Sequence, residues 1–233
     1  MARRTVAPAR VPADGVLDGL RVAVDPSGVV LGRDSVSAPV LVRLFGPEPM
    51  SVTFVGGWWA AQILLYRCLA HGAMVVVDGL DTGTPAEHGT MAGLSQWLGI
   101  DRAIGAVAGR VRPLYGGSMP VWPSSPIQPL LRLYDTGPSG PPGRVQLGAW
   151  QTQVTVLSRL TPAGLPAVAN ADLVLAQRMD PAEAALIGSA LLLGSDLIAR
   201  FGEMDNEMVA AFRGPAVRYA WLTPTALERQ LFG

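Results

Sequence analysis

The residues best placed for chemistry are two adjacent glycines, Gly56 and Gly57, and an acid, Asp78, about 20 residues further on. The glycines follow a β-branched and aromatic run, Val52 to Val55, and precede a helix-favouring run, Trp58 to Ala70. Strand, glycine turn and helix are the outline of a dinucleotide-binding unit. In such a unit the glycines let a phosphate approach the helix N-terminus, and the acid holds a ribose hydroxyl.

The match to that unit is incomplete. The fingerprint needs three glycines, whereas this chain has Gly56 and Gly57 followed by Trp58 and Trp59, whose bulk stands where a pyrophosphate would approach. The two tryptophans therefore favour a structural role for Gly56 and Gly57, in which the glycines only allow a tight turn from the strand into the helix. Nucleotide binding through Gly56, Gly57 and Asp78 is the alternative.

Other groups that could do chemistry are few. The chain has no lysine, which excludes a lysine Schiff base and the phosphate-binding lysine of a P-loop. His71 lies at a helix end, where it fits a capping role, and His88 lies in a polar stretch. Cys68, the one cysteine, reads as a buried apolar residue without a disulfide partner, and no metal spacing is present. The sequence therefore predicts no catalytic residue, no cofactor and no metal.

The glycines belong to a predicted βαβ unit that covers Val52 to Val77, with Met74 to Val77 as its second strand. A helix crossover between parallel strands is nearly always right-handed, and we expect its two strands to be neighbours. The helix is apolar on most sides. Its polar stripe carries Trp58, Gln62 and Tyr66 on one face, which we predict as an interface.

The rest of the chain predicts an α/β fold. Leu130 to Tyr134 reads as a buried strand, and Val145 to Leu160, where polar and apolar residues alternate, reads as an antiparallel edge. Asp180, Pro181 and Glu183 form a capping box that starts a helix, and a hairpin surrounds Arg213 to Pro215. We expect a mixed, mostly central sheet that is flanked by helices. This arrangement would be a degenerate version of a Rossmann-like or glycosyltransferase-like fold.

Length and composition set further bounds. A chain of 233 residues fits one α/β domain over residues 15–233, after a polar tail over 1–14 and with a flexible Gly/Pro loop near 136–144. Formal net charge is zero, which speaks against a nucleic-acid partner. Hydrophobic residues make up 49%. The uncharged stretch Pro49 to Tyr66 is interrupted by glycine and polar residues, so it does not predict a membrane span.

Several blocks together resemble a known family. They are VGGWWAAQILLYRCLAHGAMVVV, VWPSSP, AWQTQVTVL, ADLVLAQRMDPAEAALIGSALLL, and a closing Arg-Gly followed by Leu-Thr-Pro-Thr. Over Leu20 to Leu231 they are similar to the soluble domain of EccE, a membrane-complex subunit of type VII (ESX) secretion systems. Family members usually carry two N-terminal membrane helices before this domain, and this sequence predicts none.

The resemblance implies a non-catalytic structural subunit at the cytoplasmic face of the bacterial inner membrane. It also implies other membrane subunits of the secretion complex as partners, with membrane contact through the missing helices. The alternative is a Rossmann-like enzyme or sensor that binds a nucleotide or nucleotide sugar. The two hypotheses differ at Asp78, whose replacement by alanine removes ligand binding only under the second.

Overall fold

The structure, a computed structural model, describes residues 28–78, 97, 99–100, 109–114, 123–135 and 146–232. The expected tail over 1–14 and the Gly/Pro loop near 136–144 lie outside these residues. The described strands are β1 (Val29–Arg33), β2 (Pro39–Val42), β3 (Met50–Val55), β4 (Met74–Asp78), β5 (Val111–Pro113), β6 (Leu130–Tyr134), β7 (Gln151–Leu157), β8 (Leu173–Ala176), β9 (Met208–Arg213) and β10 (Ala216–Trp221). The helices are α1 (Trp58–Ala70), α3 (Leu165–Ala169), α4 (Pro181–Leu191), α5 (Ser195–Glu203) and α6 (Ala226–Phe232).

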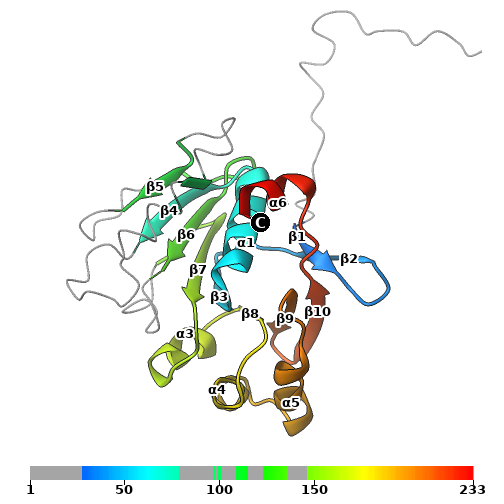
Figure 1. Cartoon of the computed structure of the whole chain (residues 1–233). Helices are drawn as coiled ribbons and strands as arrows, with labels where there is room; N and C mark the ends of the chain where they lie inside the picture. The colour runs from blue at the N-terminus through cyan, green and yellow to red at the C-terminus, as the bar shows by residue number, and fades with distance from the viewer. Residues whose placement is uncertain are drawn as a thin grey trace, which may run out of the picture.

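All ten of these strands belong to one sheet, in the order β2-β1-β10-β9-β8-β3-β7-β6-β4-β5 (Figure 1). From β8 to β5 the strands run parallel, with β3 between β7 and β8. From β8 to β2 each neighbouring pair is antiparallel. The expected α/β fold with a mixed central sheet is confirmed, and β3 holds its middle.

Side chains of β3 alternate between two packed layers. Val52 and Phe54 belong to the core cluster that also contains Leu64 and Cys68 of α1. Val55 belongs to a second cluster, with residues of α4 and the end of α5, and the Thr53 hydroxyl donates to the Ala167 carbonyl of α3 at 2.8 Å. Because successive residues of a strand point to opposite faces, α1 covers one face of β3, and α3, α4 and α5 lie on the other.

The expectation that β3 and β4 are neighbours is wrong, since β7 and β6 lie between them. A helical crossover sets the handedness of the connection but not the number of strands it passes. Here α1 carries the chain past two strand positions, and later segments fill the gap.

The expected antiparallel edge at Val145 to Leu160 is also wrong, because β7 is an interior strand parallel to both β3 and β6. Its polar residues suggested a solvated face. Thr152 and Thr155 are instead buried, and the Thr152 hydroxyl donates to the Leu44 carbonyl. A hydroxyl that finds a backbone acceptor removes most of the cost of burying it.

Several local predictions are confirmed. The Asp180 side chain accepts from the Glu183 amide at 2.8 Å, and the Glu183 side chain reaches back to Asp180, which completes the capping box of α4. β9 and β10 form the closing hairpin.

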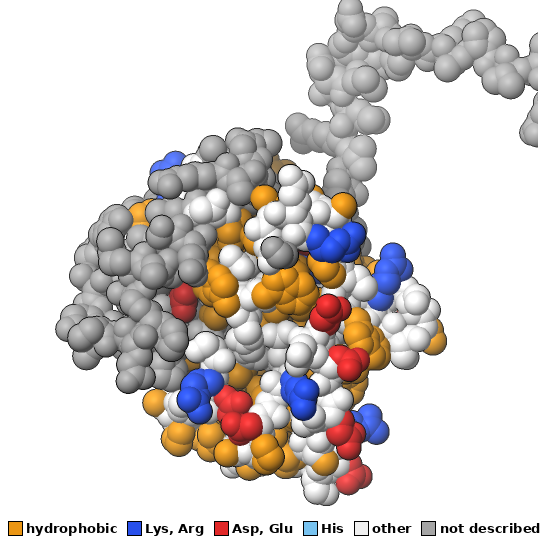
Figure 2. All heavy atoms as spheres, in the orientation of Figure 1, with side chains coloured by type: hydrophobic (Ala, Val, Ile, Leu, Met, Phe, Trp, Pro, Cys, Tyr) orange, Lys and Arg blue, Asp and Glu red, His pale blue; other side chains and the backbone are white. Residues whose placement is uncertain are grey.

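No described helix is long and apolar enough to span a membrane. On the face seen in Figure 2, basic and acidic side chains are interspersed.

Candidate nucleotide site at the carboxyl edge of the sheet

The carboxyl end of β3 lies where the chain leaves neighbouring parallel strands toward opposite faces. After β3 it enters α1 on one face, and after β7 it leads to α3 on the other. In open α/β sheets, ligands bind in the crevice outside the carboxyl ends of strands at such a switch point. The two residues at this position are Gly56 and Gly57, which alone connect β3 to α1.

The turn is tight because another side chain fills the space beside it. A Cβ on Gly56 would lie 2.5 Å from Gln177 Oε1 and 2.9 Å from Phe54 Cζ, so any other residue there would force these side chains to shift. Gly57 is the N-cap residue of α1, in extended conformation, and its amide donates to Gln177 Oε1 at 2.8 Å. Gln177 follows β8 and is 6% exposed. Sequence reasoning missed it, because nothing within the sequence signals that this glutamine reaches a glycine 120 residues away.

The helix start itself has the character of an anion site. The first amides of an α-helix have no intrahelical acceptor, and the helix dipole places partial positive charge there. The first turn of α1 contains no acidic residue that would neutralise it. Trp58 and Trp59, which were expected to obstruct a ligand, both pack against the core on the α1 face.

An acid lies on the same edge two strands away. Asp135 directly follows β6, and its carboxylate accepts from the Trp97 indole N–H at 3.0 Å. Trp97 is fully buried and meets Trp58 edge to face, with ring centroids 4.2 Å apart. Burial raises the pKa of Asp135, and the hydrogen bond from Trp97 opposes that rise in part. The signal that could have found Asp135 is an acid immediately after a fully apolar strand end.

Two arginines follow the strands on either side of β3. Val55 is in register with Leu157 of β7 and with Ala176 of β8, and Arg159 and Arg178 each come two residues later. Both are exposed. The backbone of each arginine therefore follows the end of a strand that neighbours β3, in a chain that has no lysine.

Asp78, the predicted ribose ligand, lies elsewhere on this edge. It ends β4, in register with Tyr134 of β6, and β7 separates β6 from β3. Three strand spacings of about 4.8 Å separate β4 from β3 by about 14 Å, and the register of the strands sets Asp78 level with Thr53, before the glycine turn. The structure thus brings Gly56 and Gly57 together with Gln177 and does not place Asp78 beside them.

The predicted interface stripe of α1 meets parts of this chain. Trp58 contacts Trp97, and the Tyr66 ring meets Phe232 of α6 edge to face at 5.9 Å. Both rings are half-buried, as is Gln62. The use of this stripe by a partner stays a prediction.

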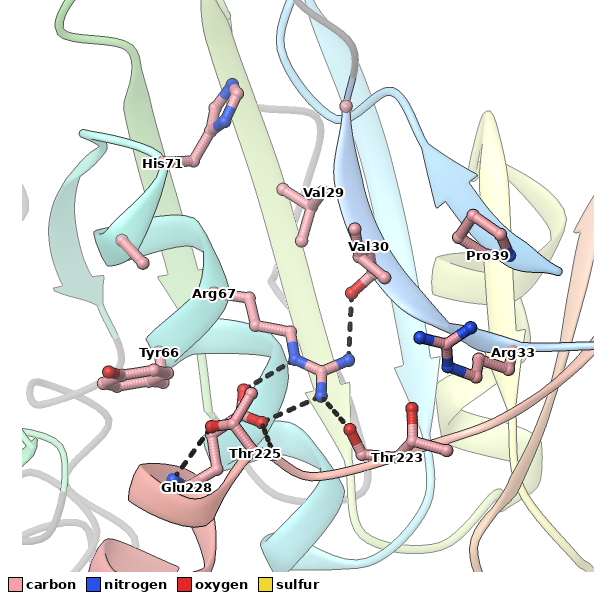
Figure 3. A pocket seen from close by; sticks show the side chains of 12 residues that line it. Val29, Val30, Arg33, Pro39, Tyr66, Arg67, His71, Thr223, Thr225 and Glu228 are labelled. Atoms are coloured by element: carbon pink, nitrogen blue, oxygen red, sulfur yellow. Dashed lines mark hydrogen bonds and ion pairs between the residues drawn. The ribbon is translucent and has the colours of Figure 1, made fainter. Parts of the chain in front are cut away.

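A hollow of about 560 Å³ lies at the other end of α1, between β1 and α6 (Figure 3). Arg67 crosses it and forms an ion pair with Glu228, with its Nε donating to Oε1 at 2.6 Å and Nη2 to Oε2 at 3.0 Å. Its remaining N–H groups donate to the carbonyls of Val30, Leu31 and Thr223. All five guanidinium donors are used internally, so this arginine is a clamp between elements rather than a ligand group.

Cys68 and His71 have structural roles, and His88 lies outside the described residues. Cys68 is fully buried, and desolvation raises the pKa of its thiol to about 12. His71 is the C-cap residue of α1, and its ring stacks on Phe45 at 6.0 Å. Within the described residues, no group of His, Cys, Asp and Glu could hold a metal ion.

Comparison with known proteins gives matches at the level of structure. No protein-family model matches the sequence, and no curated protein is detectably similar to it. VirB4 of Thermoanaerobacter pseudethanolicus matches with a TM-score of 0.58 at 9% identity, over 88% of this chain and 99% of that one. The cytoplasmic domain of the type VII secretion ATPase EccC of Thermomonospora curvata matches with a TM-score of 0.51 at 12% identity, over 92% of this chain and 32% of that one. At these identities the likeness concerns the fold.

These matches correct the main functional expectation. A non-catalytic subunit that is not an enzyme was predicted, yet a solved structure with this fold is that of an ATPase, EccC. The fold therefore gives no support to the expectation that the chain is non-catalytic. One of the solved structures with this fold comes from a type VII secretion system, the kind of system to which the resemblance of the sequence also points.

Proposed function

We propose that this chain is a nucleotide-binding enzyme domain of the ATPase class that works in a bacterial secretion system. The observation that carries the proposal is the Gly56-Gly57 turn into the N-terminus of α1, at the switch point of a sheet shared with EccC. Phosphate oxygens suit this position because backbone N–H groups and the helix dipole both favour negative charge there.

Arginine supplies the positive charge in this proposal. A P-loop lysine is absent, whereas Arg159 and Arg178 follow the ends of the two strands that neighbour β3. Guanidinium groups bind phosphate through paired, charge-assisted hydrogen bonds. Asp135 is the acid on the same edge, and a buried carboxyl with a raised pKa is typical of a functional position.

Calorimetric titration with ATP and ADP, with and without magnesium, tests the proposal. Hydrogen bonds to charged groups contribute about 1.5–3 kcal/mol, so Arg159→Ala or Arg178→Ala should each weaken binding by about tenfold or more. Arg218→Ala removes the same charge from an exposed position on β10 and serves as the control. Equal affinities for all three variants would contradict the assignment of the arginines.

We also propose a secretion system, partners and a location for this chain. The blocks that resemble EccE and the fold match with EccC both support type VII secretion, with other membrane subunits as partners at the cytoplasmic side of the inner membrane. Crosslinking of the chain in native membranes tests this placement. Recovery of crosslinks to subunits of the secretion complex is the expected result, and a chain that fractionates away from the membrane without crosslinks would oppose it.

A further inference from the structure

Gln177 connects the glycine turn to a distant segment of the fold. Its Oε1 accepts from the Gly57 amide, and its Nε2 donates to the Asn206 carbonyl, each at 2.8 Å. Asn206 lies in the connection between α5 and β9. One buried side-chain amide therefore spans from the start of α1 to the loop before β9.

That loop is in turn bonded to the end of β10. Asp205 accepts from the Trp221 indole N–H at 3.1 Å, and its carbonyl accepts from the Met208 amide at 3.0 Å. The Leu222 amide donates to the Glu207 carbonyl at 2.8 Å. Residues 205–207 thus hold β9, β10 and Gln177 together, on the antiparallel half of the sheet.

The two hydrogen bonds of Gln177 depend on each other. The Gly57 amide has one hydrogen, so it cannot donate fully to Gln177 and to a phosphate oxygen at once. The side-chain amide of glutamine is planar, so a rotation that moves Oε1 away from Gly57 also moves Nε2 away from Asn206. At 6% exposure, water does not readily replace either partner.

We propose that Gln177 is a relay residue: a ligand oxygen that takes the Gly57 amide displaces Gln177 and thereby releases Asn206. Ligand binding at the glycine turn then weakens the hydrogen bonds of the α5–β9 connection and of the end of β10. The inference rests on the proposed nucleotide site and adds its regulation. Without ligand, Gln177 takes the place of the anion, and its displacement lowers the apparent affinity.

Hydrogen exchange of the full chain, with ATP and magnesium as the probe, tests the relay. In the wild type, ligand should speed exchange at the amides of Met208 and Leu222 by about fivefold, the effect of one lost hydrogen bond on a local opening equilibrium. In Gln177→Ala, exchange at these amides should be fast before ligand is added and should not change afterwards. Calorimetry should show tighter binding for this variant, because the ligand no longer has to displace a side chain.

Two further variants keep the test decisive. Gln177→Met preserves the length of the side chain and replaces Gln177→Ala if that variant unfolds. Gln151→Ala is the matched control, since the Gln151 side chain also accepts from a glycine amide, that of Gly148 at 3.0 Å, but at the opposite end of β7. It should leave the ligand response of Met208 and Leu222 unchanged.

The outcomes separate the relay from the proposed function. Binding without any change at Met208 and Leu222 in the wild type overturns the relay alone. Binding with the expected change, lost in Gln177→Ala and kept in Gln151→Ala, supports it. Absence of binding in the wild type and in every variant overturns both.

Discussion

Replacement of Arg67 by methionine should destabilise the fold strongly. The guanidinium is 12% exposed and its partner Glu228 only 1% exposed, so the change leaves a carboxylate buried without its counter-charge. Removing one member of a buried ion pair costs about 3–5 kcal/mol. A domain of this size loses about 2–4 °C of Tm per kcal/mol, so the expected fall in Tm is about 6–20 °C.

Urea unfolding of four variants measures this effect and locates its cause. Arg229→Met removes an exposed arginine from α6 and one hydrogen bond, to the Pro224 carbonyl, and should cost no more than about 1 kcal/mol. The double variant Arg67→Met/Glu228→Gln should be more stable than Arg67→Met, since the amide keeps the bond to the Thr225 amide and carries no charge. The single variant Glu228→Gln completes the cycle.

The stabilisation that the Arg67–Glu228 ion pair provides also depends on pH. Burial raises the pKa of Glu228, but hydrogen bonds from Arg67 and Thr225 and the charge of Arg67 lower it further than burial raises it. Its folded-state pKa is therefore below the ordinary value, so its stabilisation is present above the ordinary carboxyl pKa and is lost as pH falls through the folded value. A cost of less than about 1 kcal/mol for Arg67→Met would refute the reasoning.

Three other perturbations have clear expected outcomes. Gly56→Ala should lower the free energy of unfolding by about 1–3 kcal/mol, because the added Cβ would lie 2.5 Å from Gln177 Oε1. Gly57→Ala should be tolerated, since its Cβ would lie 3.6 Å from the same atom. The midpoints of denaturant unfolding of the two variants test this difference. Asp135→Asn should stabilise the fold near neutral pH. Because the pKa of Asp135 is raised in the folded protein, its contribution to stability is fully present below the ordinary carboxyl pKa and is lost as pH rises through the folded-state pKa. Free energies of unfolding measured at several pH values check this prediction. The same pH dependence of stability for the wild type and Asp135→Asn would contradict it. Native Cys68, with a thiol pKa of about 12 and no exposure, should react with a thiol reagent only as fast as the protein opens, and rapid labelling of the folded protein would count against its burial.

The elements with strong local signals were predictable from the sequence. The bounds of α1 agree with the run Trp58 to Ala70, and the capping box of α4 formed where Asp180 and Glu183 predicted it. These features depend on side chains within one or two helical turns of each other. Local physical chemistry decides them before the rest of the chain folds around them.

The arrangement of strands and most of the candidate site were not predictable. The order of β3, β7, β6 and β4 depends on which later segment fills the gap that α1 leaves, and no local pattern states this. Gln177 and Asp135 reach the site through sheet pairing across many residues. Gly56 and Gly57 were found because a strand, a turn and a helix that follow one another in sequence are read from a single stretch.

A thermal-shift titration of the intact chain with ATP and ADP tests the central claim most directly. Nucleotide at 100 times its dissociation constant stabilises a fold by about 2.7 kcal/mol, which corresponds here to a rise in Tm of about 5–11 °C. We predict a saturable rise that Arg159→Ala and Arg178→Ala reduce and Arg218→Ala leaves intact. No rise with any nucleotide at millimolar concentration, with or without magnesium, would contradict nucleotide binding by this fold.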